Sequence, residues 1–413
     1  MSLLTIKLAF KVLWRRPIFT LISLFGIVVT MVTLLVAAAM FEQALGTHYP
    51  ELDRDRMLSV DWMRMEGPNG SSTGNPGFAF LSKYVRTLSS AELVSIVTEQ
   101  RRGAVYAGET KAMVYLKRTD GAFWQMIQVK ILEGRALTVE DDSSGRRMAV
   151  LNRSTCNQLF SGAACVGQSI DLDGHGFQVV GVVEDVPFTS KFSFADVWVT
   201  HGSSPNSEYM EQFSEGFSAM IRARRVEDLP KIKSELAARL PEIPLPDTKR
   251  FKKLLVVAET PIEAFSREVL DSDNGERRVG LVVTLFMAGV VLFMLLPAVN
   301  LANLNISRTL ERTSEIGVRR AFGASSRAMV VQFLSENLIL TLIGAAISAI
   351  VAQAVLSLIN DTGWMPYSRL SINAPVLLCG LLLALLFGVL SGAYPAWRMS
   401  RLHPAEALRG RAA

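Results

Sequence analysis

Four long stretches without a charged residue constrain this chain more than any other feature of its sequence. They cover residues 18–40, 279–302, 337–359 and 374–396, and each is 23 or 24 residues long. A helix needs roughly 20 apolar residues to cross the hydrocarbon core of a bilayer, which is about 30 Å thick. Buried helices of soluble domains seldom stay uncharged for so long, so these stretches predict four transmembrane helices.

The rest of the chain is polar enough to form a separate domain. A mean hydropathy of +0.29 is too high for an ordinary soluble protein, and 20% charged residues are too many for a chain embedded throughout its length. We therefore expect a membrane protein with four transmembrane α-helices and a large α+β periplasmic domain between the first and second helices. Within that domain, strands are expected at residues 58–63, 112–117, 147–151, 177–183 and 196–200, and helices at 154–160 and 229–240.

One segment of this domain looks unlike a strand. Residues 67–76 are rich in Gly, Pro, Asn and Ser, and they predict a turn-rich loop. Residues 70–74 also fit the pattern G-x-S-x-G, whose catalytic form requires a strand before it and a helix after it. The flanking Gly, Pro and Asn residues supply neither, so we exclude a serine nucleophile here.

Lysine and arginine flank the apolar stretches unevenly, and this predicts their orientation. Residues 1–17 carry four basic residues and no acid, and residues 303–336 and 397–413 are also rich in arginine, whereas residues 360–373 contain only Arg369. Both termini and the 303–336 connection are therefore expected in the cytoplasm, and residues 42–278 outside it. The formal net charge of +5 is concentrated at the membrane, which favours a membrane partner over nucleic acid.

These observations predict a multi-pass protein of a bacterial inner membrane with defined boundaries. One alternative concerns residues 37–39, which could pass for a signal-peptidase site, but the apolar run far exceeds the roughly 7–15 residues of a signal-peptide core and favours an uncleaved anchor. The predicted order is a cytoplasmic N-terminal helix (1–17), a first span (18–41), a periplasmic domain ending in a helical stalk (42–278), a second span (279–302), a cytoplasmic coupling loop (303–336), a third span (337–359), a short periplasmic loop (360–373), a fourth span (374–396) and a cytoplasmic tail (397–413).

A stripe of small residues in the last span predicts helix packing. Gly380, Ala384, Gly388 and Gly392 recur every four residues and therefore share one helix face. Lipid provides no hydrophobic drive between helices, so small residues are needed to let two backbones approach closely. The sequence leaves open whether the partner helix belongs to the same chain or to a second copy.

Two of the three cysteines, Cys156 and Cys165, lie nine residues apart in the predicted periplasmic domain. Disulfides persist in that compartment, but spacing alone does not establish the geometry of a bridge. Cys379 lies in the last span and is expected to be a small packing residue. No cysteine and histidine cluster has zinc spacing, so no metal site is expected.

The cytoplasmic connection contains a short amphipathic segment, residues 314–322, which is closed by Gly323. Glu315, Arg319 and Arg320 can form ion pairs with a partner, whereas Ile316 and Phe322 are large apolar side chains. This chemistry suits docking into a groove on a cytoplasmic partner. It equally suits a helix that lies on anionic headgroups, and the residues alone leave the two open.

Several of these motifs resemble the FtsX/MacB-type ABC permeases. The likeness rests on residues 315–317, 319–321 and 323–324, on the tail at 392–396 and 400–409, and more loosely on residues 134–137, 149–152 and 166–183. It covers residues 1–41, about 130–185, and 258–409, the last being the FtsX-like permease region. Cys165 stands where that family usually has other loop residues, so a bridge would be a local trait.

The resemblance implies a dimer of identical or related permease chains, a separate cytoplasmic ATPase and, in some cases, a periplasmic adaptor. The ATPase would dock on the coupling helix formed by Glu315, Ile316, Gly317, Arg319, Arg320, Ala321, Phe322 and Gly323. Family functions include export of drugs and peptides, release of lipoproteins and control of cell-wall hydrolases. A mechanotransmitter that regulates a periplasmic enzyme or adaptor without moving cargo is the alternative, and a receptor without an ATPase is a third class.

The chain itself lacks the phosphate-binding motif of an ATPase. A phosphate-cradling loop needs G-x-x-x-x-G-K-[ST], and the sequence contains no Gly-Lys dipeptide. The zinc-protease motif H-E-x-x-H is also absent. We therefore expect a non-catalytic permease that binds no cofactor, with ATP and Mg²⁺ bound by the partner ATPase.

Overall fold

The computed structural model describes residues 17–270, 279–311 and 325–400. The chain divides into two compact units. The helical unit comprises Met1–Glu42, Val283–Thr362 and Leu370–Ala413, and the α+β unit comprises Gln43–Val282 and Gly363–Arg369.

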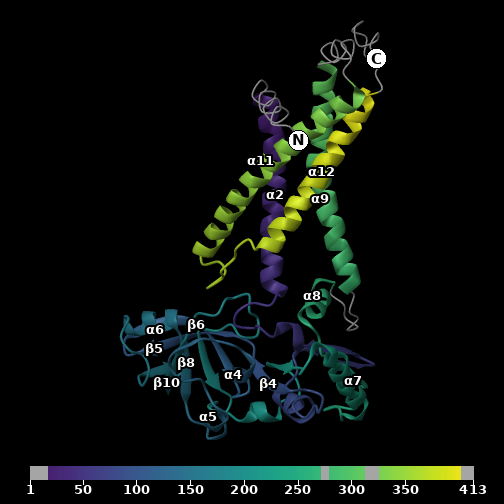
Figure 1. The fold of residues 1–413 in the computed structure, drawn as a ribbon. Helices are drawn as coiled ribbons and strands as arrows, with labels where there is room; N and C mark the ends of the chain where they lie inside the picture. Colours follow the sequence, from purple (N-terminus) through teal and green to yellow (C-terminus); the bar gives the residue numbers. More distant parts are fainter. Residues whose placement is uncertain (1–16, 271–278, 312–324, 401–413) are drawn as a thin grey trace. The chain divides into compact units, whose positions relative to one another are not determined.

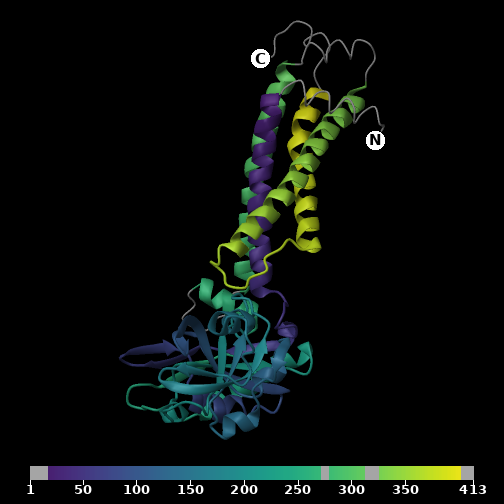
Figure 2. The same cartoon turned by 90° about the vertical axis from the view of Figure 1, so that its left-hand side faces the viewer.

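Four long helices form the described part of the helical unit, and they make one bundle in both views (Figure 1, Figure 2). Three segments among the described helices are long and apolar enough to cross a membrane, namely Thr20–Leu45, Val279–Leu296 and Val330–Asp361, and a shorter apolar segment covers Ala374–Leu390. The helices are α2 (Pro17–Leu45), α9 (Val279–Glu311), α11 (Ser326–Asp361) and α12 (Ala374–Ser400).

All four helices are longer than the apolar stretches that predicted them, and two of them extend into the expected 303–336 loop. Helix α9 continues to Glu311 and helix α11 already begins at Ser326, so much of the expected 303–336 loop is helical. The apolar pattern ends where charged residues begin, but helix formation does not, because Leu, Arg, Gln and Glu are all good helix formers. The remaining part of that loop, residues 312–324, lies outside the described residues, as does the N-terminal segment 1–16.

Close contacts between small and large residues hold the bundle together. A methyl group on Gly388 would lie 2.6 Å from Thr341 Oγ1 of α11, and one on Gly380 would lie 3.2 Å from Leu35 Cδ2 of α2. Ala384, between them, is 5% exposed and belongs to the buried cluster of the bundle. The stripe therefore packs within one chain at these positions. Gly392 lies in α12, but its surroundings fall outside the described side chains.

The main sheet of the α+β unit has ten strands in the order β1-β12-β4-β6-β11-β8-β10-β9-β5, with β7 paired to β10. Its bounds are β1 (Met57–Val60), β4 (Leu93–Thr98), β5 (Arg101–Ala107), β6 (Thr110–Thr119), β7 (Ile131–Gly134), β8 (Met148–Asn152), β9 (Ser169–Leu172), β10 (His175–Val183), β11 (Val197–Thr200) and β12 (Phe217–Arg222). Described helices of this unit include α3 (Phe78–Phe80), α4 (Phe123–Met126), α5 (Val139–Ser143), α6 (Arg153–Phe160), α7 (Leu229–Arg239) and α8 (Pro261–Val269).

Strand β5 pairs with both β9 and β6, so one half of this sheet closes into a ring: β6, β11, β8, β10, β9 and β5. Its buried apolar cluster includes Val114, Leu151 and Val199, together with Cys156 and Leu159 from helix α6. A second cluster lies where α7 packs against β4 and β12, and it includes Ile96, Ile221 and Ile232. The expected α+β composition is thus present.

The strands expected at residues 112–117, 147–151, 177–183 and 196–200 correspond to β6, β8, β10 and β11, and the two expected helices correspond to α6 and α7. The strand expected at 58–63 instead ends at Val60, and a new strand, β2 (Met63–Gly67), begins in a second, three-stranded sheet. That sheet has the order β13-β2-β3, with β3 (Gly70–Gly74) and β13 (Lys253–Val256).

The prediction of a loop at residues 67–76 was wrong. Strand β3 pairs antiparallel with β2 in a tight hairpin that opposes Gly67 to Gly70. Four of its five residues are exposed, so the strand shows no alternation between apolar and polar side chains. Backbone pairing alone holds it in place, and the side-chain pattern therefore did not indicate it.

Candidate functional site at the three junction segments

Three segments of the α+β unit adjoin the points where the chain passes between its two units. The chain enters this unit after Glu42, leaves it at Val282, and returns for residues 363–369. We name the segments the first anchor (residues 43–56), the second anchor (residues 258–270) and the third anchor (residues 363–369). Each is fixed to the rest of the unit through a carboxylate that is almost fully buried: Glu51 is 2% exposed and Asp196 5%, and the side chain of Asp61 is 6% exposed.

The first anchor begins in the last turn of helix α2 and is held by Glu51. One of its carboxylate oxygens accepts hydrogen bonds from the main-chain N–H of Ser193, at 3.1 Å, and from the Ser193 hydroxyl. The other oxygen lies 3.6 Å from Arg54 Nε. The carbonyl of Pro50 also accepts from the N–H of Gln128, at 2.8 Å. The segment is thus tied to two loops that lie far from it in sequence.

The second anchor contains helix α8 and an internal ion pair, in which Arg267 Nε donates to Glu259 Oε2 at 2.8 Å. The same guanidinium lies 3.2 Å from Asp61 Oδ1 and stands 5.3 Å from the centre of the Trp62 ring. Burial raises the pKa of Glu259, and the charge of Arg267 opposes this shift. Arg267 therefore favours the ionised form of this buried carboxylate.

Local sequence explains why α8 begins where it does. Thr260 and Glu263 form a capping box, in which the main-chain N–H of Thr260 donates to Glu263 Oε2 at 2.8 Å. Pro261 occupies the first turn, where its missing N–H has no consequence. The strand-like segment before the cap is paired by hydrogen bonds between Glu259 and Ser59 in both directions.

The third anchor is the short connection between α11 and α12, and it reaches Asp196 at the start of β11. The hydroxyl of Tyr367 donates to Asp196 Oδ1 at 2.9 Å. Asn152 Nδ2 donates to the same oxygen at 2.9 Å, and the N–H of Tyr115 donates to Oδ2 at 2.7 Å. Burial raises the pKa of Asp196 and that of Tyr367, so the phenol stays protonated and acts as a donor.

Further contacts support this docking. The carbonyl of Pro366 accepts from the N–H of Phe188 at 3.0 Å, and the Tyr367 ring packs in a buried cluster beside Phe194. Arg369 lies 3.0 Å from Glu184, but its side chain is 76% exposed. An exposed pair of this kind contributes little. The buried Tyr367–Asp196 contact therefore holds the loop.

Replacing Tyr367 by phenylalanine is expected to release this loop. The ring stays buried, but the hydrogen bond to a charged group disappears, which costs about 1.5 kcal/mol. Trypsin cleavage after Arg369 should then accelerate about tenfold, because the cleavage rate follows the population of the open loop. Tyr106→Phe is the matched control, since Tyr106 is 39% exposed and lies in β5. Equal cleavage rates in both variants would contradict the assignment.

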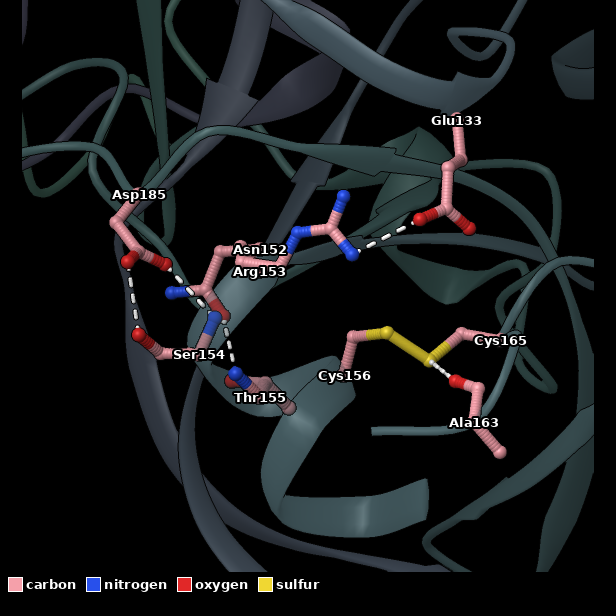
Figure 3. Close-up of a disulfide and its surroundings, with 9 residues drawn as sticks. All are labelled: Glu133, Asn152, Arg153, Ser154, Thr155, Cys156, Ala163, Cys165 and Asp185. Atoms are coloured by element: carbon pink, nitrogen blue, oxygen red, sulfur yellow. Dashed lines mark hydrogen bonds and ion pairs between the residues drawn. A yellow bond between two sulfur atoms is a disulfide. The ribbon is translucent and has the colours of Figure 1, made fainter. Parts of the chain in front are cut away.

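The cysteine pair whose bonding the sequence left open is joined in the structure (Figure 3). Cys156 lies on helix α6 and Cys165 in the segment after it, and both side chains are buried, at 1% and 0% exposure. Asn152 caps α6 by accepting from the N–H of Thr155 at 2.8 Å, and its amide nitrogen also contacts Asp196. The bridged helix and the third anchor therefore share one residue.

Removing the disulfide with Cys156→Ala and Cys165→Ala is expected to lower the free energy of unfolding by about 3 kcal/mol. The bridge closes a loop with a sequence separation of 9, and that closure restricts the unfolded chain. Thermal unfolding of the full chain, with and without reductant, measures the effect. Reductant should shift the wild-type transition to that of the double variant, and Cys379→Ala should leave it unchanged. A double variant as stable as the wild type would refute the expectation.

The site residues predicted from the sequence and the residues that form the three anchors overlap little. The coupling helix at Glu315–Gly323 lies outside the described residues. Sequence patterns did not indicate the three anchors, because their partners are far apart in the chain: 171 residues separate Tyr367 from Asp196. Only the Thr260–Glu263 capping box left a local signal.

Comparisons with known proteins agree with this architecture. Residues 20–239 match the model of the MacB-like periplasmic core domain, and residues 287–404 match that of the FtsX-like permease C-terminal region. The ABC transporter permease YknZ of Bacillus subtilis is 23% identical over 426 residues, covering 99% of this chain and 100% of YknZ. The macrolide export ATP-binding/permease protein MacB of Wolinella succinogenes is 22% identical over 97% of this chain, and the match covers 60% of MacB.

The chain thus spans the full length of YknZ but only about 60% of MacB. Among solved structures, the extracellular domain of YknZ matches with a TM-score of 0.36 and 12% identity, over 48% of this chain and 99% of that domain. The core-domain match alone covers more than half of the sequence. The chain therefore belongs to the FtsX/MacB-type family of ABC transporter permeases.

Proposed function

We propose that this chain is the permease subunit of an ABC transporter and that it couples ATP hydrolysis by a separate cytoplasmic ATPase to movement of its α+β unit in the periplasm. The observation that carries the proposal is the set of three anchors. In each of the three, the described segment is fixed by a hydrogen-bonded carboxylate with a buried side chain, namely Glu51, Asp61 or Asp196.

This arrangement suits the transmission of force. A joint that unfolds easily would absorb a displacement of the spans, whereas a joint held by buried polar contacts opens only at a cost of several kcal/mol. Glu51, Asp61 and Asp196 place such contacts on all three segments. Movement of the helices would therefore be passed to the α+β unit as a whole.

The proposed topology has four spans, with α12 as the fourth, and both termini in the cytoplasm. The arginine-rich flanks support it, and so does membership of a membrane permease family. In this orientation the coupling helix at residues 315–323 faces the ATPase. A second permease chain, identical or related, would complete the transporter, and the partner ATPase would bind ATP and Mg²⁺.

We propose export of a drug, peptide or lipid-linked molecule as the transport function. A mechanotransmitter without cargo is the second candidate, and one observation favours it. The apolar pocket of about 640 Å³ among α2, α9 and α12 is lined by no charged side chain of the described residues, so it offers nothing to orient a charged cargo. ATP-dependent uptake of candidate cargo into inverted vesicles separates the two candidates.

Hydrogen–deuterium exchange tests the coupling itself. The permease and its ATPase would be compared in nanodiscs without nucleotide and in a vanadate-trapped state. Exchange in residues 43–56, 258–270 and 363–369 should change with the nucleotide state, although ATP binds on the opposite side of the membrane. An exchange pattern of the α+β unit that is identical in both states would refute the proposal.

A further inference from the structure

A polar cleft of about 360 Å³ opens in the α+β unit. This volume is within the range of about 300–1,000 Å³ that is usual for pockets holding small molecules. The second anchor accounts for the charges of one wall of the cleft, but not for those of Lys117 and Glu99. Three basic and three acidic side chains line it: Lys117, Lys191, Arg267, Asp61, Glu99 and Glu268.

Some of these charges already satisfy one another. Asp61 lies 3.2 Å from Lys191 Nζ and 3.2 Å from Arg267 Nη2, and Arg267 also pairs with Glu259 of the second anchor. One wall of the cleft is therefore neutralised by contacts within the protein. That wall is shared with the second anchor.

Lys117 on strand β6 is different, because it is buried without a carboxylate partner. Its side chain is 1% exposed, and its Nζ donates to the carbonyls of Phe192, at 2.6 Å, and Lys191, at 3.1 Å. An ammonium group has three donors. The described residues supply these two acceptors and no carboxylate within 4.0 Å, so one donor is left over and the charge is balanced only at a distance, by Glu51 and Glu99. A buried charge of this kind is costly unless an anion pairs with it.

Glu99 limits which anion could do so. Its side chain lines the same cleft, accepts a hydrogen bond from Asn75 Nδ2 at 3.1 Å, and acts on Lys117 through its charge. A simple anion bound at Lys117 would be repelled by Glu99. A molecule that carries a carboxylate and an ammonium group satisfies both.

We propose that this cleft binds a small zwitterion of about dipeptide size, whose carboxylate contacts Lys117 and whose ammonium group contacts Glu99. The wall formed by Asp61, Lys191 and Arg267 then connects the bound molecule to the second anchor. Binding of a molecule in the cleft would in this way affect the second anchor, which adjoins a junction between the two units.

The proposal predicts the direction in which the affinity of the cleft changes with pH. Burial lowers the pKa of Lys117 to about 7, and Glu51 and Glu99 oppose this shift whereas Lys191 adds to it. A bound carboxylate favours the charged lysine and raises this pKa again. Affinity should therefore be highest below pH 7 and should fall as the pH rises above 7, by up to about tenfold per pH unit.

Calorimetric titration of the full chain in nanodiscs, without any ATPase, tests the site. The probes are glycylglycine, N-acetylglycylglycine, which lacks the ammonium group, and glycylglycinamide, which lacks the carboxylate. Glycylglycine should bind, and each blocked probe should bind at least about tenfold more weakly. Lys117→Met should weaken glycylglycine binding by at least the same factor. Lys111→Met is the matched control, because Lys111 lies on the same strand but is exposed and does not line the cleft, and it should leave the affinity unchanged.

Two results would overturn the proposal: no binding of glycylglycine at millimolar concentration, or equal affinity for the blocked probes. Should Lys117→Met fail to fold, Glu99→Gln provides an independent test, since it should bind glycylglycine and N-acetylglycylglycine equally. A preference that Glu99→Gln leaves unchanged would also overturn it. No ATPase is present in these titrations, so their outcome is independent of the proposed coupling function.

Discussion

Reversing the charges of Arg319 and Arg320 to glutamate will abolish co-purification of the ATPase. Both residues belong to the amphipathic segment that the proposed function assigns to ATPase docking. Two reversed charges at a protein–protein contact replace attraction by repulsion, and each close charge pair is worth roughly 2–5 kcal/mol when it is buried in the interface. Together they would weaken binding more than about 100-fold, which is enough to lose the ATPase during affinity purification.

The control for this experiment is a second double reversal, Arg398→Glu with Arg401→Glu, which lies on the same side of the membrane in the proposed topology. It changes the net charge by the same amount but leaves residues 314–323 intact. Accessibility labelling of introduced cysteines confirms that both variants are inserted in the wild-type orientation. Retention of the ATPase by the Arg319/Arg320 variant would remove this segment from the docking surface.

Replacing Arg267 by methionine will destabilise the α+β unit by about 3–5 kcal/mol. The substitution removes the partner of Glu259, which is 0% exposed, and one partner of Asp61, whose side chain is 6% exposed. Breaking a buried pair costs this much because the remaining charge stays buried without compensation. Methionine keeps much of the apolar contact with Trp62, so the loss reports mainly on the charge. Urea unfolding followed by tryptophan fluorescence measures it.

The effect should depend on pH in a predictable direction. Burial raises the pKa of Glu259 in the folded protein, and loss of Arg267 raises it further. A carboxyl group with a raised folded-state pKa binds its proton more tightly when folded, so the variant should regain stability as the pH falls through that pKa. Arg101→Met is the control, because its pair with Asp173 is more than half exposed and should contribute at most about 1 kcal/mol. Similar losses in both variants would contradict the role given to the second anchor.

The features tested by these experiments are of two kinds, local sequence patterns and contacts that only the fold creates. The apolar stretches, the arginine-rich flanks and the motif at residues 315–324 could be read directly from the sequence, and with them the membrane class and the family. Each is a local pattern, since a helix in lipid must satisfy its own backbone and be apolar over its length. Most strands of the ring and both predicted helices of the α+β unit were also evident, because one face of each is buried and leaves a periodic signal.

The tertiary structure decided the rest. It joined Cys156 to Cys165, paired the glycine-rich strand β3 with β2, and placed Gly388 against Thr341 of the same chain. It also brought Tyr367 to Asp196 and left Lys117 buried without a carboxylate within 4.0 Å among the described residues. Such contacts join residues that are distant in sequence. A single polar side chain forms no repeating sequence pattern, so its partner cannot be predicted from the sequence. Whether a buried charge is paired depends on which strands and loops surround it, and only the folded chain determines that.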